Sequence, residues 1–160
     1  MGAAAATLAI AATVSILPTG DASATTFGSR LINVNSGKCL EVTDWSTANG
    51  AGIRQWDCTG GANQNWTWDG QGRWVNQYSG KCMEIKDWST GPGGVADQWD
   101  CTAGANQKWD ILSADGGSYQ FIQNRNSGLY LEILGWNTQN GAVADQWSLS
   151  SGANQKWNYT

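Results

Sequence analysis

The chain has 160 residues and a formal net charge of −4 at pH 7, with 13 acidic side chains against 9 Lys and Arg and no histidine. Such an acidic chain lacks the basic face of a nucleic-acid-binding protein, and without histidine it has neither Ser-His-Asp nor Cys-His catalysis nor an imidazole metal site. It also contains 11 Trp, more than a core of this size requires, and a tryptophan often presents its polar edge to a partner.

Residues 3–17 form one apolar run of small and aliphatic side chains. Pro18 ends the run, and Ala22 and Ala24 place small residues at the −3 and −1 positions of a cleavage site. This arrangement is typical of a secretory signal peptide, and the run is too short to span a membrane. We therefore predict a signal peptide over residues 1–24 and a secreted, extracellular mature protein without a membrane span.

The mature chain, residues 25–160, is long enough for one domain with its own core. Short aliphatic segments bounded by Gly, Asn, Asp or Ser occur at 38–42, 81–86 and 129–134 and predict β-strands. No stretch keeps a 3.6-residue period over three turns, and glycine is too dense for helices. The sequence therefore predicts an all-β domain.

One sequence unit occurs three times, at residues 35–66, 78–109 and 126–157. Tryptophans stand at the same three positions of each unit: Trp45, Trp56 and Trp66; Trp88, Trp99 and Trp109; Trp136, Trp147 and Trp157. Trp68 and Trp74 lie outside this pattern. A period of this length indicates a repeat architecture.

The repeats, here called repeats 1, 2 and 3, are expected to cover about 30–70, 71–115 and 116–160 of a single domain. Closing three equivalent β units around an axis removes exposed sheet edges, so a closed architecture is favoured. A propeller needs about four or more blades, and three units therefore indicate a different closed fold.

The repeats also pair the cysteines. Repeats 1 and 2 each contain two cysteines 19 residues apart, Cys39 with Cys58 and Cys82 with Cys101. Repeat 3 has Tyr130 and Leu149 at the two matching positions, so both partners are lost together. We therefore predict the disulfides Cys39–Cys58 and Cys82–Cys101, which suit an exported protein.

Each repeat begins with SGKCLEV, SGKCMEI or SGLYLEI and ends with Gly-Ala-Asn-Gln-x-Trp. This set of motifs resembles the ricin-type β-trefoil lectin family, which includes the family 13 carbohydrate-binding modules of secreted actinobacterial enzymes. The resemblance covers essentially all of residues 30–160. It implies a β-trefoil, a six-stranded barrel capped by three hairpins, with pseudo-threefold symmetry and one potential sugar pocket per repeat.

The resemblance also implies roles for three sets of residues. An acid two positions after the first cysteine accepts hydrogen bonds from sugar hydroxyls, and an aromatic two positions before the second cysteine lies under the sugar ring. An Asn-Gln pair ahead of the last tryptophan adds polar contacts. The matching residues are Glu41, Glu84 and Glu132; Trp56, Trp99 and Trp147; and Asn63, Gln64, Asn106, Gln107, Asn154 and Gln155.

This chain departs from the family pattern in two ways. The acid is Glu rather than the commoner Asp, so it reaches one methylene further. The family's frequent Gln, two residues before the platform aromatic, is Arg54 in repeat 1, Asp97 in repeat 2 and Asp145 in repeat 3. These three residues belong to the predicted sites, and Arg54 indicates that the first pocket differs from the other two. Repeat 3 is also expected to differ in binding, because it lacks the disulfide.

The chemistry of the residues leaves several roles open. The three tryptophans that end the repeats are expected in the core. Trp56, Trp99 and Trp147 serve as surface platforms or pack in the core, and the three glutamates bind hydroxyls or are solvated strand residues. The glutamines either contact sugar or bond backbone. Trp45, Trp88 and Trp136 lie in turn-like segments and form a second pocket wall or a lid over the barrel end.

The predicted function is that of a secreted, stand-alone lectin or carbohydrate-binding module with up to three sugar sites. The resemblance implies ligands such as xylan, arabinan or galactose-containing glycans. No paired catalytic acids, phosphate loop or calcium loop occurs, so we expect no enzyme activity, cofactor or metal. The alternatives are the targeting module of a truncated glycoside hydrolase and a trefoil that binds or inhibits a protein.

Overall fold

The computed structural model describes residue 2 and residues 29–160, and the predicted signal peptide, apart from residue 2, lies outside the described residues. The described part contains the strands β1 (Leu31–Asn33), β2 (Cys39–Val42), β3 (Ala51–Trp56), β4 (Trp66–Trp68), β5 (Trp74–Asn76), β6 (Cys82–Ile85), β7 (Gly94–Trp99), β8 (Trp109–Ala114), β9 (Tyr119–Asn124), β10 (Tyr130–Ile133), β11 (Ala144–Trp147) and β12 (Trp157–Tyr159).

Helical structure in the described residues is limited to single 3₁₀ turns. These are η1 (Thr43–Trp45), η2 (Ala62–Gln64), η3 (Lys86–Trp88), η4 (Ala105–Gln107), η5 (Asp115–Gly117), η6 (Leu134–Trp136) and η7 (Ala153–Gln155). None of these turns approaches the length that a membrane-crossing helix needs. The predicted all-β class is confirmed, and the three predicted strand segments correspond to β2, β6 and β10.

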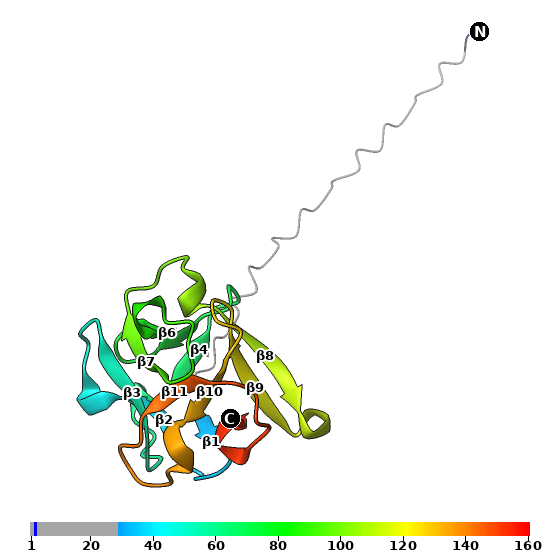
Figure 1. Cartoon of the computed structure of the whole chain (residues 1–160). Helices are drawn as coiled ribbons and strands as arrows, with labels where there is room; N and C mark the ends of the chain where they lie inside the picture. The colour runs from blue at the N-terminus through cyan, green and yellow to red at the C-terminus, as the bar shows by residue number, and fades with distance from the viewer. Residues whose placement is uncertain (1, 3–28) are drawn as a thin grey trace.

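Six strands close into a barrel. Antiparallel ladders join β12 to β1, β4 to β5, β8 to β9 and β9 to β12. A bridge between Ser29 and Trp66 links the β1 side to β4, and a hydrogen bond from Trp109 N to Gly72 O links the β5 side to β8. The longest hairpin of the barrel, β8–β9, extends at one side of the molecule (Figure 1).

Three further hairpins cap this barrel, and each belongs to one repeat: β2–β3, β6–β7 and β10–β11. They also pair with one another, β3 with β7 and β7 with β11, and a bridge between Arg54 and Val143 joins β3 to the β11 side. This is the barrel capped by three hairpins that the sequence predicts (Figure 1). The closed ring leaves the three pockets described below in equivalent positions.

The three tryptophans that end the repeats, here called the closing tryptophans, lie in the core. Trp66, Trp109 and Trp157 have no exposed surface and pack with aliphatic residues of the cap hairpins. Each indole donates its Nε1–H to a backbone carbonyl of the same repeat, at 3.0–3.1 Å. A buried indole N–H needs such a partner, and the prediction of a core role is confirmed.

A buried glutamine of each cap hairpin holds the loop of a neighbouring repeat. Gln55 Nε2 of repeat 1 donates to two backbone carbonyls of repeat 3, at 2.8 and 3.0 Å. Gln98 binds the repeat 1 loop and Gln146 the repeat 2 loop in the same way. All three glutamines are fully buried, so each repeat completes the backbone hydrogen bonds of another.

Both predicted disulfides are present, and each joins the start of a cap hairpin to the segment that follows it. In repeat 3, Tyr130 pairs with Trp147 in the register that the first cysteines have with their tryptophans. The Tyr130 ring packs edge-on against Phe121, with 5.8 Å between centroids. Aromatic packing therefore stands where repeats 1 and 2 have a covalent bond.

The two tryptophans outside the threefold pattern face each other across β4 and β5. Trp68 and Trp74 are direct partners in the ladder, with ring centroids 4.9 Å apart in an edge-on arrangement. Trp74 is 2% exposed and joins the core cluster. Their role is to close the junction between repeats 1 and 2, where this hairpin has only three residues in each strand.

Candidate functional site

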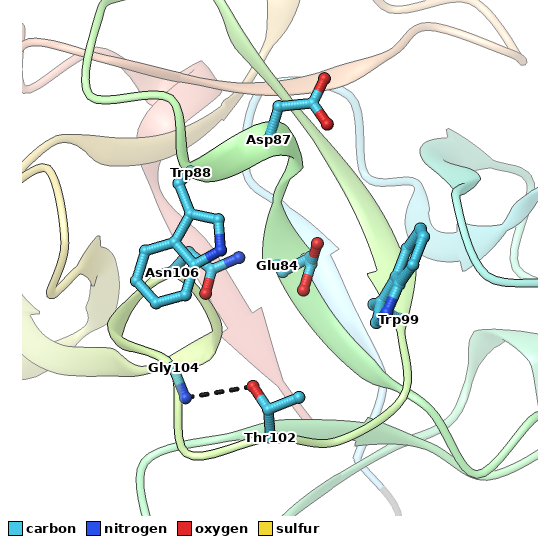
Figure 2. A pocket seen from close by; sticks show the side chains of 7 residues that line it. All are labelled: Glu84, Asp87, Trp88, Trp99, Thr102, Gly104 and Asn106. Atoms are coloured by element: carbon cyan, nitrogen blue, oxygen red, sulfur yellow. Dashed lines mark hydrogen bonds between the residues drawn. The ribbon is translucent and has the colours of Figure 1, made fainter.

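Each repeat carries a cavity beside its cap hairpin, formed by residues of that repeat alone. The largest, in repeat 2, has a volume of about 520 Å³ and is lined by Glu84, Asp87, Trp88, Trp99, Thr102, Gly104 and Asn106. Figure 2 shows Glu84 between the two indoles, which form opposite walls. The cavity of repeat 3, about 280 Å³, is lined by Glu132, Leu134, Gly135, Trp136, Trp147 and Ser150. That of repeat 1, about 230 Å³, is lined by Glu41, Asp44, Trp45, Arg54, Trp56, Thr59 and Asn63.

The glutamates form the floor of the pockets and are held in fixed orientations. Glu41, Glu84 and Glu132 lie on β2, β6 and β10 and are 4–8% exposed. The Nε2 amides of Gln64, Gln107 and Gln155 donate to their Oε2 atoms at 3.0, 2.6 and 2.7 Å, respectively. Burial raises the pKa of Glu84 and of Glu132, and the hydrogen bonds from glutamine oppose that shift.

The glutamines and asparagines lie behind the glutamates and are almost fully buried. The glutamines have no exposed surface, and the asparagines are 1–2% exposed. Asn63, Asn106 and Asn154 donate to backbone carbonyls of Val42, Ile85 and Ile133 at 3.2–3.4 Å. Both sets of residues therefore fix the glutamate and its strand, and Asn63 and Asn106 also line their pockets.

The residues here called the platform tryptophans, Trp56, Trp99 and Trp147, end the strands β3, β7 and β11. Trp99 and Trp147 are each 44% exposed, whereas Trp56 is less exposed than either of them. Each indole edge lies near a glycine of another repeat, where an added Cβ would come into van der Waals contact with the ring. A Cβ built on Gly50 would be 3.7 Å from Trp99, for example.

The residues here called the loop tryptophans, Trp45, Trp88 and Trp136, end η1, η3 and η6 in the left-handed region, with φ of 55–59°. They are 48–55% exposed and line the pockets opposite the platforms. A non-glycine residue in this region is strained unless its surroundings fix it. The structure places these three indoles at the pockets as second walls.

Each loop tryptophan is held by the first residue of the repeat that follows it in the ring. Asn126 Nδ2 donates to Trp88 O and Asn35 Nδ2 to Trp136 O, both at 3.2 Å. In repeat 1 the corresponding contact is the edge-on packing of Tyr78 against Trp45, with centroids 5.0 Å apart. The strained wall of each pocket is thus anchored from a neighbouring repeat.

Arg54 occupies the pocket of repeat 1. Its Nε donates to Glu41 Oε1 and its Nη2 to Asp44 Oδ1, both at 2.9 Å. Its guanidinium carbon lies 4.4 Å from the centroid of the Trp56 ring. Arg54 therefore covers the platform and takes the carboxylate oxygen that Gln64 and Asn63 leave free, since both of them donate to Oε2.

Asp97 and Asp145 stand at the sequence position of Arg54 in the other two repeats, but neither lines the pocket of its repeat. Asp97 instead borders a separate cavity of about 250 Å³, together with Arg54 and Lys86. Asp97 faces Glu84 and Asp145 faces Glu132 across their hairpins, as Arg54 faces Glu41. They are 2% and 0% exposed, and neither carboxyl oxygen of either residue has a hydrogen-bond partner. Burial and the charge of the facing glutamate raise the pKa of each aspartate from 3.8 to about 7.

Several residues that line the pockets or support their walls are absent from the sequence-based prediction. Gly61, Gly104 and Gly152 lie under the loop tryptophans, and a Cβ on any of them would be 2.4–2.9 Å from a ring atom. Thr59, Thr102 and Ser150, and the acids Asp44 and Asp87, also line the pockets. The sequence feature that could have identified these glycines is the Gly-Ala-Asn motif, which occurs in all three repeats.

Known proteins share the sequence pattern and the architecture of this chain. A family model described as the ricin-type beta-trefoil lectin domain matches residues 27–157. The designed threefold-symmetric protein ThreeFoil is 34% identical, with a TM-score of 0.79 over 82% of this chain and 96% of that one. The β-trefoil prediction is confirmed by this likeness.

Two longer proteins match as well. The exo-β-1,3-galactanase 1,3Gal43A of Clostridium thermocellum is 37% identical, with a TM-score of 0.80 over 86% of this chain and 30% of that one. Serine protease 1 of Rarobacter faecitabidus is 47% identical over 36 residues, which is 22% of this chain and 7% of the protease. The chain thus spans under a third of the galactanase and a small part of the protease.

Proposed function

Because the chain belongs to the ricin-type β-trefoil lectin family, which gives it a carbohydrate-binding role, we propose that it is a secreted lectin that does not catalyse a reaction on its ligand. Secretion is supported by the predicted signal peptide and by two disulfides, which persist in oxidising compartments. The non-catalytic role is supported by the burial of Asp97 and Asp145, the acids that face the glutamates of repeats 2 and 3. Their carboxyl oxygens are inaccessible, so they do not form a pair of catalytic acids with Glu84 and Glu132 around a ligand.

One observation carries the proposal: in repeats 2 and 3, an exposed indole and an oriented carboxylate border the same cavity. A sugar ring has an apolar face of C–H groups and a fringe of hydroxyls. An indole suits the first, and a carboxylate accepts strong, charge-assisted hydrogen bonds from the second. The proposed binding residues are Trp99 with Glu84 and Trp147 with Glu132, flanked by Trp88 and Trp136.

We propose that repeat 1 contributes little to sugar binding in the native protein. Arg54 lies over Trp56 and is bonded to Glu41, so a sugar would have to displace an ion pair and a cation–π contact. Of the three equivalent pockets, two are then open. Two weak sites on one rigid body gain affinity for a polymer through effective concentration.

The galactanase likeness makes a galactose-containing polysaccharide the first ligand to test, ahead of the xylan and arabinan that the family resemblance implies. The same likeness favours a second candidate function. Because the chain matches 30% of that longer enzyme, a targeting role within a larger glycoside hydrolase is the main alternative to a stand-alone lectin.

A pull-down on insoluble polysaccharides, combined with a glycan array, tests the proposal. The wild type is expected to bind at least one glycan and to release no reducing sugar from it. The double variant Trp99→Ala/Trp147→Ala should lose binding, whereas Trp56→Ala, the matched control in the covered pocket, should retain most of it. A wild type that binds no glycan contradicts the function, and equal binding by the double variant contradicts the assigned pockets.

A further inference from the structure

We propose that the pocket of repeat 3 prefers 6-deoxy sugars, in which a methyl group replaces the hydroxymethyl group of a hexose, whereas the pocket of repeat 2 prefers the complete hexose. This inference rests on the proposed carbohydrate-binding function and names a separate ligand class for each open pocket. It is argued from the two positions before the loop tryptophan, which are Lys86 and Asp87 in repeat 2 and Leu134 and Gly135 in repeat 3.

The side chains that border the two pockets differ in polarity. Both pockets contain a glutamate and two indoles. The pocket of repeat 2 adds three polar side chains, those of Asp87, Thr102 and Asn106, whereas the pocket of repeat 3 adds only the polar side chain of Ser150 and the apolar side chain of Leu134. Repeat 3 therefore offers a ligand more apolar surface and fewer hydrogen-bond partners than repeat 2.

Leu134 lines the pocket of its repeat, and its counterparts in the other repeats do not. Thr43 and Lys86 border the separate cavity of about 250 Å³ and are absent from the walls of the pockets of repeats 1 and 2. Leu134 is 48% exposed and lies in the same turn as the exposed indole of Trp136. A methyl group that covers this leucine removes apolar surface from water, which is favourable.

Gly135 leaves open space beside Leu134. A Cβ built on the glycine would meet no atom within 4 Å. The turn itself does not require glycine, because Asp44 and Asp87 adopt the same left-handed conformation, with φ of 50° and 53° against 63° in Gly135, and aspartate tolerates this region. The glycine therefore changes the surface of the pocket without changing the course of the backbone.

Asp87 lines the cavity of repeat 2 at the position that Gly135 has in repeat 3 (Figure 2). It is exposed and takes part in none of the ion pairs among the described residues, whereas the corresponding Asp44 is bound by Arg54. A carboxylate accepts strong hydrogen bonds from hydroxyls, and a methyl group placed against it would remove water without replacing its hydrogen bonds. Repeat 2 therefore favours a sugar with all of its hydroxyls.

The small volume of the repeat 3 pocket favours a 6-deoxy sugar over an N-acetylated one, although both carry a methyl group. The cavity measures about 280 Å³, against about 520 Å³ in repeat 2. An N-acetyl group makes the sugar larger and brings an amide N–H and C=O, which need partners when they are covered. The polar side chains that border this cavity are Glu132 and Ser150, and a 6-deoxy sugar adds no polar group to them.

The direct test compares three sugars that differ only in the substituent at one ring carbon: D-galactose with hydroxymethyl, D-fucose with methyl and L-arabinopyranose with hydrogen. Glucose, 6-deoxyglucose and xylose form a parallel series. The wild-type protein is titrated by NMR, where the indole N–H signals of Trp136 and Trp147 report repeat 3 and those of Trp88 and Trp99 report repeat 2. At repeat 3 we expect the 6-deoxy sugar to bind about fourfold more tightly than both other members. At repeat 2 we expect the hexose to bind most tightly.

Exchange of the two positions between the repeats gives a second test. Leu134→Lys/Gly135→Asp gives repeat 3 the residues of repeat 2 and should abolish the preference of repeat 3 for the 6-deoxy sugar. The reciprocal variant, Lys86→Leu/Asp87→Gly, should weaken the preference of repeat 2 for the hexose. Both variants keep the indoles and the glutamates of the two pockets.

The matched control is Leu112→Lys/Gly116→Asp. It makes the same two changes outside the pockets, at an exposed leucine of β8 and at a glycine of η5 with φ of 68°. Both pockets should keep their wild-type preferences in this variant, and a loss of preference here would contradict a local role of Leu134 and Gly135.

The outcomes separate this inference from the function on which it rests. If no saccharide binds, the proposed function fails. If the hexose binds repeat 3 as tightly as the 6-deoxy sugar, the function stands and the inference is wrong. Equal binding of L-arabinopyranose and D-fucose refutes the methyl contact, and tighter binding of N-acetylgalactosamine than of D-fucose refutes the choice of a 6-deoxy sugar. An undiminished preference in Leu134→Lys/Gly135→Asp overturns the role of these two residues.

Discussion

Gly152 lies directly against the indole of Trp136: a Cβ added to the glycine would be 2.4 Å from Cζ2 of that ring. The same contact links Gly104 to Trp88. Neither glycine is required by its backbone, since both have φ near −60 to −70°, where any residue is comfortable. Their role is to let a tryptophan wall lie flat on the polypeptide.

Gly104→Ala/Gly152→Ala should therefore damage binding more than folding. The added methyl groups push the loop tryptophans out of place and also press on the neighbouring asparagine amides. We expect the affinity for the best glycan to fall about tenfold, which is ~1.4 kcal/mol, as measured by calorimetry. The matched control is Gly91→Ala, where the Cβ meets no atom within 4 Å; an equal loss there would contradict the explanation.

The buried aspartates predict an unusual dependence of stability on pH. A carboxyl whose pKa is raised to about 7 keeps its proton in the folded protein, while the unfolded chain releases it near pH 4. Between these values the folded state binds more protons, so the free energy of unfolding falls as pH rises from about 4 to about 7. Above about pH 7 both aspartates are ionised in the folded and the unfolded protein, so the free energy of unfolding no longer falls for this reason.

Asp97→Asn/Asp145→Asn removes the charge that causes this loss. The double variant should be more stable than the wild type at pH 8, by on the order of 2–4 kcal/mol for each site, and this gain should shrink as the pH falls toward 4. Urea unfolding at several pH values measures the difference. A gain that is the same at pH 4 and pH 8 would show that the aspartates are not the titrating groups.

Removal of one disulfide, by Cys39→Ala/Cys58→Ala, should lower the free energy of unfolding by ~3 kcal/mol, because the bond closes a loop of moderate length in the unfolded chain. Guanidinium unfolding checks this value. A reducing agent should destabilise the wild type by more than it destabilises the variant, which retains only Cys82–Cys101. Equal sensitivity of the two proteins would contradict the pairing.

Trp157→Phe should destabilise the protein by ~2–4 kcal/mol, as measured by urea unfolding. The substitution leaves Leu131 O without the donor that lies 3.0 Å away in the native protein, and the smaller ring leaves a cavity in the core. Trp88→Phe is the control, because its indole is 55% exposed and should have little effect on unfolding. A loss below about 1 kcal/mol for Trp157→Phe would be inconsistent with its burial.

The architecture could be predicted from the sequence because the features that specify it occur three times. Three copies of the same tryptophan spacing identify a closed threefold fold, and the joint loss of two cysteines in repeat 3 identifies the disulfide partners. The core role of the closing tryptophans could be predicted because an aromatic residue that ends every repeat is suited to the shared interior.

The details of the pockets could not be predicted from the sequence to the same extent. Arg54, Asp97 and Asp145 stand out as departures from the family pattern, but the sequence does not show that Arg54 folds back onto Trp56 or that the aspartates are buried without partners. Those facts depend on cross-strand register and on distances between side chains. The glycines under the loop tryptophans were missed because their contact joins residues 16 positions apart, such as Trp88 and Gly104.

The glutamines that bind a neighbouring repeat's loop have a consequence for how the chain can be rearranged. Gln55 joins repeat 1 to repeat 3, so the last repeat in sequence supports the first as firmly as any consecutive pair support each other. Each repeat is therefore joined to both of its neighbours in the ring, and no repeat is at an end of the folded structure. Circular permutants that open the turn after η1, η3 or η6 would cut such a contact, whereas permutants opened at the exposed η5 turn should fold and unfold as one cooperative unit.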